Sequence, residues 1–184
     1  AGGPLIVDIG TGSGAVALAL KKERPAARVI AVDLSPEALA VARDNGERLG
    51  LAVEFRQGDL LAPLEGEGPL DLVVSNPPYI PSGDLPGLPA EVRAEPARAL
   101  DGGPDGLVII RRLVAGAAAR LRPGGALALE VGDGQAAAVM ELLARAGFVD
   151  VSARRDLSRT PRVVSSRLRN AATRVTVSFL GPVR

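Results

Sequence analysis

A glycine-rich loop between a short apolar run and a helical stretch constrains the fold of this chain more than any other feature. Residues 5–9 are typical of a buried strand and residues 15–22 of a helix. The loop between them, residues 10–14, reads Gly-Thr-Gly-Ser-Gly. Glycine lets a backbone approach a ligand closely, and a helix N-terminus presents free N–H groups. The unit therefore predicts the first half of a βαβ nucleotide-binding fold.

An acidic residue follows the second predicted strand, residues 28–32. Asp33 lies 23 positions after Gly10 and could bind both hydroxyls of a ribose. Ser35 caps the next predicted helix, residues 36–50, so that helix does not need Asp33 as its cap. A second cap remains the alternative for Asp33. The loop and Asp33 predict an adenosine-bearing cofactor without distinguishing NAD from others, and a purely structural turn is the other interpretation.

A second acidic residue follows the third predicted strand, residues 53–57. Asp59 lies at the sheet edge where ligands bind in open α/β folds. Its carboxylate could accept the exocyclic amine of adenine while Leu60 packs on the ring. A solvated loop aspartate is the alternative.

A stiff bend, Asn76-Pro77-Pro78-Tyr79, follows the apolar strand predicted at residues 70–74. The two prolines remove two N–H donors, and Pro77 moves Asn76 out of the helical region. The bend thus offers the Asn76 side-chain oxygen and backbone carbonyls to a planar –NH2 group, whose face Tyr79 could cover. The alternative is a proline turn that ends a strand, with Tyr79 closing the core.

The segment at residues 80–104 is rich in proline and glycine and is too long for a simple connection, which favours a lid or recognition loop. Within it, Glu91 and Glu95 could face a substrate or simply be solvated. After this segment we expect a helix at residues 107–121, a strand at 126–131 and a second helix at 135–146. An antiparallel hairpin of two strands, at 148–155 and 162–168, would follow. The alternating segment at 174–180 is left unassigned.

The composition of the chain excludes several kinds of catalytic and metal-binding site. The 184 residues include no histidine and no cysteine, so disulfides, thiolate zinc sites, cysteine nucleophiles and histidine bases are excluded. Lys plus Arg is 22 and Asp plus Glu is 21, which argues against a generic electrostatic nucleic-acid binder. We expect no metal and no membrane span, and the lack of a signal peptide predicts a cytoplasmic protein. A chain that starts at Ala1, directly before a strand, suggests a fragment.

The order of these motifs resembles the class I S-adenosylmethionine-dependent methyltransferases, and more closely the protein-(glutamine-N5) methyltransferases that act on peptide chain release factors. The resemblance covers about residues 5–168. The matching text is VDIGTGSG (7–14), AVDLSPEAL (31–39), GDL (58–60), VSNPPYI (74–80), EV (91–92), EP (95–96), AL (99–100), GG (102–103), DGL (105–107), PGG (123–125), LE (129–130) and GF (147–148).

The resemblance implies an α/β, Rossmann-like fold: a mostly parallel seven-stranded sheet with an antiparallel last strand and helices on both faces. Residues 1–168 would be the catalytic domain, without the family's helical N-terminal docking domain, and residues 169–184 a tail of unclear role.

The resemblance also implies the ligands and their sites. S-adenosyl-L-methionine would be the cofactor and a release factor the protein substrate, with its Gly-Gly-Gln glutamine amide held by the bend at residues 76–79. The implied catalytic residues are Asn76, Pro77 and Tyr79, with Pro78 added for substrate binding. The implied cofactor-binding residues are Gly10, Thr11, Gly12, Ser13, Gly14, Asp33, Asp59, Leu60 and Asn76.

Three other functions stay open. An adenine-N6 methyltransferase of DNA or RNA would use the same bend on a flipped base, although the near-neutral charge and few aromatic residues argue against a nucleic-acid substrate. A glutamine methyltransferase of ribosomal protein is a second alternative. A non-catalytic module that binds NAD or another nucleotide, and ignores Asn76, is the third.

Overall fold

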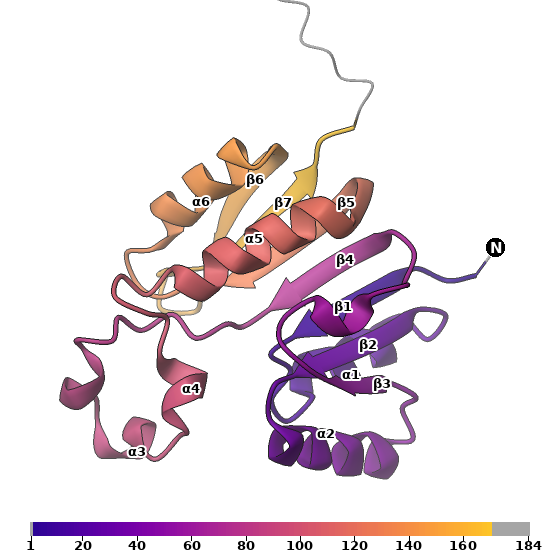
Figure 1. The fold of residues 1–184 in the computed structure, drawn as a ribbon, viewed down its shortest axis with the longest axis horizontal. Coiled ribbons are helices and arrows are strands. Elements are labelled where there is room, and N and C mark those ends of the chain that lie inside the picture. The colour runs from indigo at the N-terminus through magenta and orange to yellow at the C-terminus, as the bar shows by residue number, and fades with distance from the viewer. Residues whose placement is uncertain (1, 171–184) are drawn as a thin grey trace, which may run out of the picture.

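The computed structural model describes residues 2–170 as one seven-stranded sheet flanked by helices (Figure 1). The strand order is β3-β2-β1-β4-β5-β7-β6, with β7 antiparallel to both of its neighbours and the first five strands parallel. The strands are β1 (Leu5–Ile9), β2 (Arg28–Asp33), β3 (Glu54–Gln57), β4 (Leu70–Ser75), β5 (Leu121–Glu130), β6 (Phe148–Arg155) and β7 (Pro161–Leu168). The predicted α/β sheet with an antiparallel last strand is confirmed.

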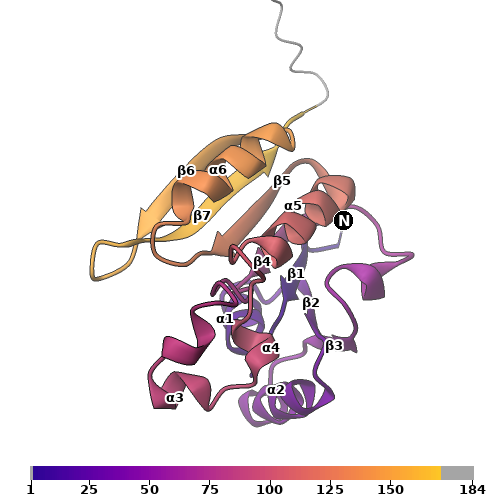
Figure 2. The same cartoon turned by 60° about the vertical axis from the view of Figure 1, so that its left-hand side comes forward.

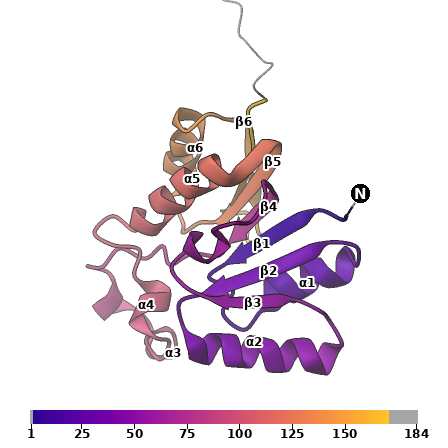
Figure 3. The ribbon, with the colours of Figure 1, turned by 45° about the vertical axis from the view of Figure 1, so that its right-hand side comes forward.

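The helices cover both faces of this sheet. They are α1 (Ala15–Glu23), α2 (Pro36–Leu49), α3 (Ala90–Arg93), α4 (Ala97–Leu100), α5 (Val108–Arg120) and α6 (Ala136–Arg145), with 3₁₀ turns η1 (Ala62–Leu64) and η2 (Leu85–Gly87). Helices α1 and α2 pack on one face, and α5 and α6 on the other (Figures 1 and 3). The short helices α3 and α4 lie beyond the strand ends (Figure 2), and α4 contacts the start of α2 through an ion pair between Arg98 and Glu37.

The alternation of side chains along β1 divides the core between the two faces. Val7 and Ile9 belong to the larger apolar cluster, which α5 and α6 cover. Ile6 belongs to the smaller cluster, together with Ala17 of α1. Asp8 points to the same side as Ile6, because successive strand residues face opposite ways. One charged residue is therefore buried beneath α1.

The structure differs from the sequence prediction at the start of β5. The sequence predicts a helix up to residue 121 and a strand from residue 126, but β5 already begins at Leu121. The register with β4 passes from Leu70↔Leu121 to Leu72↔Ala126, so the proline and glycines form a bulge within the strand. Residues that commonly form turns thus lie inside the sheet here. The alternating segment at residues 174–180 lies outside the described residues.

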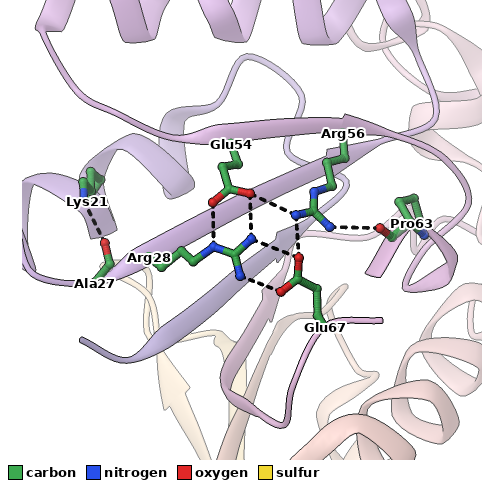
Figure 4. A network of polar contacts seen from close by, with 7 residues as sticks. All are labelled: Lys21, Ala27, Arg28, Glu54, Arg56, Pro63 and Glu67. Carbon is green, nitrogen blue, oxygen red and sulfur yellow. Dashed lines mark hydrogen bonds and ion pairs between the residues drawn. The ribbon is translucent and has the colours of Figure 1, made fainter. Parts of the chain in front are cut away.

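A network of ion pairs lies at the amino-terminal ends of strands β2 and β3 (Figure 4). Arg28, at the start of β2, bridges Glu54 of β3 and Glu67 of the loop before β4, and Arg56 bridges the same two carboxylates. Hydrogen bonds from Arg28 and Arg56 lower the pKa of Glu67 to about 2. Individual exposed ion pairs contribute little, but a network fixes the edge strand β3 against β2.

Candidate active site

A cavity of about 440 Å³ lies at the carboxyl ends of the parallel strands. The chain runs outward from β1 to β3 and then returns to the other side of β1 to form β4. Open α/β sheets bind ligands at such a switch point, because the loops that leave the two neighbouring strands diverge there. The predicted site residues that line the cavity are Gly10, Gly12, Ser13, Asp33, Asp59, Leu60, Asn76 and Pro78.

Two predicted cofactor residues lie behind the cavity instead. The buried Thr11 donates its hydroxyl to Asp8 Oδ2 over 2.6 Å. Gly14 precedes α1 with a φ of 82°, and a Cβ there would lie 3.0 Å from the Cβ of Ala42 in α2. Thr11 and Gly14 therefore shape the loop and pack the two helices together, whereas Gly10, Gly12 and Ser13 face the cavity.

Asp8 is a site residue that the sequence reasoning missed. It is 1% exposed, and its Oδ2 accepts hydrogen bonds from Thr11 Oγ1 and, over 3.1 Å, from the backbone N–H of Ala17. Burial raises the pKa of Asp8 to about 6, with a smaller contribution from the charge of Asp33. Asp8 thus joins the glycine loop to the first turn of α1. An acidic residue inside an apolar run was the signal in the sequence.

Asp33 links the glycine loop to the start of α2. Its Oδ2 accepts a 2.8 Å hydrogen bond from the backbone N–H of Gly12, and its Oδ1 accepts one of 2.9 Å from the N–H of Ser35. The predicted cap is confirmed, because Ser35 Oγ accepts the N–H of Ala38 over 3.2 Å. Asp33 therefore makes no side-chain bond to the first helical N–H groups of α2, and its carboxylate lies at the wall of the cavity.

Asp59 and Leu60 lie in the turn after β3, where Leu60 has a φ of 50°. The carboxylate of Asp59 accepts a hydrogen bond from the guanidinium of Arg112 in α5. Both side chains are about half exposed, at 53% and 49%. Asp59 is thus a paired residue at the mouth of the cavity. Arg112 was not predicted, because only the fold brings α5 next to the turn.

The bend after β4 is anchored on both sides. Ser75 is buried and donates its hydroxyl to the carbonyl of Ile9 over 2.7 Å, which fixes the end of β4 to the end of β1. The next residue, Asn76, is exposed and lines the cavity. Pro77 is buried and is not among the lining residues, so the contact of its carbonyl with a substrate stays a prediction. The bend therefore places Asn76 at the cavity beside the glycine loop, where a Cβ built on Gly10 would lie 3.9 Å from the backbone carbonyl oxygen of Asn76.

Tyr79 lies on the far side of the bend. Its backbone carbonyl accepts a 2.8 Å hydrogen bond from Gln135 Nε2. Its ring packs against the core cluster under α5 and α6, and a Cβ on Gly132 would come within 3.0 Å of Tyr79 Cδ2. Tyr79 does not line the cavity. The alternative in which Tyr79 closes the core thus describes its position here, and a role against a substrate stays a prediction.

The segment at residues 80–104 forms one wall of the cavity, through Pro96, Arg98 and Ala99. Its two ends are joined, since Ile80 exchanges backbone hydrogen bonds with Leu100 and Gly102. From α4, Arg98 Nη2 donates to Ser35 Oγ over 2.9 Å and lies 3.3 Å from Glu37 Oε2. The wall is therefore fastened to the first turn of α2.

Glu91 and Glu95 do not share a helix, because α3 ends at Arg93. Both are exposed, and neither lines the cavity. The position leaves them free for a protein partner, so their proposed contact with substrate stays a prediction.

This geometry agrees with comparisons to known proteins. A family model described as "Methyltransferase domain" matches residues 6–95. A methyltransferase from Pyrococcus furiosus superposes with a TM-score of 0.69 at 22% identity, over 91% of this chain and 76% of that one. The superposition shows that the two proteins share a fold. The 16S rRNA N2 G1207 methyltransferase of T. thermophilus, solved with AdoMet and guanosine, gives 0.66 at 23% identity, over 91% of this chain and 38% of that one.

The relatives found by sequence carry more specific names. A release factor glutamine methyltransferase from Moorella thermoacetica is 59% identical over 144 residues, which are 77% of this chain and 50% of that protein. The resemblance seen in the sequence motifs is confirmed. The chain spans about half the length of the curated relatives it matches.

Two further findings concern residues 2–170 only. Within that range, no three histidine, cysteine, aspartate or glutamate side chains gather as they would around a metal ion. Nor does the same range contain a helix that is long and apolar enough to cross a membrane.

Proposed function

We propose that the chain is the catalytic domain of an S-adenosylmethionine-dependent protein-glutamine N5-methyltransferase, with residues 1–168 as that domain. Its substrate is the glutamine of the Gly-Gly-Gln loop of peptide chain release factors. The observation that carries the proposal is the position of Asn76, which lines the same cavity as Gly10 and Asp33. The names of the relatives, at 46–59% identity, support the choice of substrate.

The cavity residues suit the cofactor by their chemistry. Gly10 and Gly12 have φ values of 70° and 56°, which L side chains rarely adopt, so the loop backbone stays open to a ligand. The Asp33 carboxylate suits the two ribose hydroxyls, while Asp59 and Leu60 offer an acceptor and an apolar surface to adenine. When bound, S-adenosylmethionine supplies an electrophilic methyl group on a sulfonium.

Asn76 and Pro77 would act on the amide of the substrate. An amide nitrogen is a poor nucleophile, because its lone pair is delocalised into the carbonyl. The Asn76 Oδ1 and the Pro77 carbonyl can each accept one proton of the –NH2 group, which aligns the nitrogen and stabilises the charge that develops on it. The proton that leaves the nitrogen passes to water, so this chemistry needs no histidine base.

Methyl transfer from labelled S-adenosylmethionine tests the proposal. Purified release factor, ribosomal protein and DNA are offered side by side, to the chain alone and to the chain fused to the amino-terminal region of its Moorella relative. We expect label in release factor alone, at the loop glutamine, and none when that glutamine is replaced by glutamate. Label in ribosomal protein or DNA would assign one of the alternative functions. Binding of the cofactor with no transfer to any substrate would favour a binding module.

A further inference from the structure

We propose that Arg112 is a positioning residue that makes the cavity specific for adenine, by holding the carboxylate of Asp59. This inference rests on the proposed function, because it assumes that an adenosine-bearing cofactor occupies the cavity. Arg112 belongs to α5, and Ile109 of the same helix lines the cavity. It acts through Asp59 and need not touch the cofactor itself.

The contact with Arg112 involves only one of the two oxygens of the Asp59 carboxylate. Arg112 Nη2 donates to Asp59 Oδ2 over 2.5 Å. Among the described residues, no group donates to Asp59 Oδ1. Asp59 and Leu60 both line the cavity, as does Ile109, which precedes Arg112 on α5 by one turn. One carboxylate oxygen is thus held by the protein, and the other remains available at the cavity wall.

Two separate constraints fix the direction of that free oxygen. The backbone is set by the turn, in which Leu60 has a φ of 50° and the carbonyl of Asp59 accepts the N–H of Ala62 over 3.0 Å. The side chain is set by Arg112. Because Asp59 is 53% exposed, its carboxylate would otherwise rotate freely in solvent. The ion pair with Arg112 thus orients the Asp59 carboxylate, which is otherwise exposed to solvent.

A fixed carboxylate oxygen discriminates between purine bases. The exocyclic amine of adenine donates a hydrogen bond, whereas the 6-oxo group of hypoxanthine only accepts one. A carboxylate that faces this position therefore binds the first base and repels the second. If the carboxylate can rotate away from the base, hypoxanthine is repelled less, and the preference for adenine over hypoxanthine declines.

The neighbouring arginine provides a matched control. Arg111 is adjacent to Arg112 on α5, but its guanidinium is paired with Asp105, which does not line the cavity. Arg111→Ala removes an arginine of similar exposure and an ion pair of the same kind. This variant should therefore show any effect of losing an arginine from α5 while leaving the ion pair of Asp59 intact.

The experiment measures the dissociation constants of S-adenosylhomocysteine and S-inosylhomocysteine by calorimetry. A hydrogen bond to a charged group contributes about 1.5–3 kcal/mol, so the parent should prefer the adenine ligand by about 10- to 100-fold. Arg112→Ala should lower this ratio by up to about fivefold, since exposed pairs contribute up to about 1 kcal/mol. Arg112→Lys should retain part of the preference, Asp59→Ala should abolish it, and Arg111→Ala should match the parent.

The results separate the inference from the function on which it rests. If the parent binds neither ligand, the proposed function is wrong. If the parent binds both ligands equally, Asp59 does not recognise the amine and the inference is overturned. The inference is also overturned if the parent discriminates and Arg112→Ala keeps the full ratio. Because the readout is a ratio for one folded sample, a change in stability alone cannot imitate the expected result.

Discussion

Asp33 Oδ2 accepts a 2.8 Å hydrogen bond from the backbone N–H of Gly12, and this bond joins the end of β2 to the glycine loop. The second oxygen of the same carboxylate holds the N–H of Ser35 at the start of α2. One side chain thus fixes the relative positions of three elements around the cavity. Changes at Asp33 should affect the shape of the cofactor site as well as its charge.

We expect Asp33→Ala to abolish cofactor binding. S-adenosylhomocysteine at a hundredfold excess over its Kd should stabilise the parent by about 2.7 kcal/mol, which appears as a higher melting temperature. The variant should fold and show no shift. Asp44→Ala, on the exposed side of α2, is the control and should shift like the parent. Equal shifts in Asp33→Ala and the parent would remove Asp33 from the site.

The buried Asp8 predicts a pH dependence of stability. Its pKa in the folded protein is raised to about 6 from an ordinary 3.8, so folding favours the protonated form. The stabilisation that results is complete below about pH 4 and is lost as the pH rises through about 6.

Asp8→Asn cannot titrate. The unfolding free energy of the parent relative to this variant should therefore fall by roughly 2–3 kcal/mol between about pH 4 and about pH 7.5. Urea denaturation at several pH values measures the difference. A difference that stays constant across this range would contradict the account of Asp8.

Arg98→Ala should accelerate the release of the cofactor. The side chain fastens α4 to Ser35 and Glu37, and α4 forms one wall of the cavity. Because such exposed contacts contribute up to about 1 kcal/mol, the dissociation rate of S-adenosylhomocysteine should rise by up to about fivefold in stopped-flow measurements. Arg93→Ala, on the same segment but bonded to the carbonyl of Leu88, should leave the rate unchanged. Identical rates in both variants would show that Arg98 does not hold the wall.

Glu91 and Glu95 should affect the protein substrate and not the cofactor. They are exposed on the segment that follows the bend, away from the cavity. Replacing both by alanine should raise KM for release factor and leave the Kd of S-adenosylhomocysteine as it is in the parent. Steady-state kinetics and calorimetry measure the two quantities. If neither quantity changes, the two glutamates are simply solvated.

The sequence predicted the features that depend on neighbours along the chain. The glycine loop and the Ser35 cap are local patterns, and the structure has both of them. The cavity lining was predicted where strand ends carry the residue, as at Asp33 and Asn76, because parallel strands bring their carboxyl ends to one edge.

The features that the sequence could not predict are contacts between distant elements. Arg112 meets Asp59 only because α5 crosses the sheet beside the turn after β3. Arg98 reaches Ser35 only because the long segment folds back over α2. The bulge at the start of β5 is a third case, since the same proline and glycines suit a turn or a bulge until the register with β4 is known.

Single-turnover methyl transfer by Asn76→Ala, with saturating cofactor and release factor as substrate, tests the central claim most directly. The backbone at Asn76 is fixed by Ser75 before it and two prolines after it, so the variant should fold and keep its affinity for S-adenosylhomocysteine. It loses one acceptor for the substrate –NH2 group, and losing one such preorganised contact should lower the rate by about 10²–10³-fold. A variant that transfers methyl within about threefold of the parent would contradict the amide-binding role of the bend.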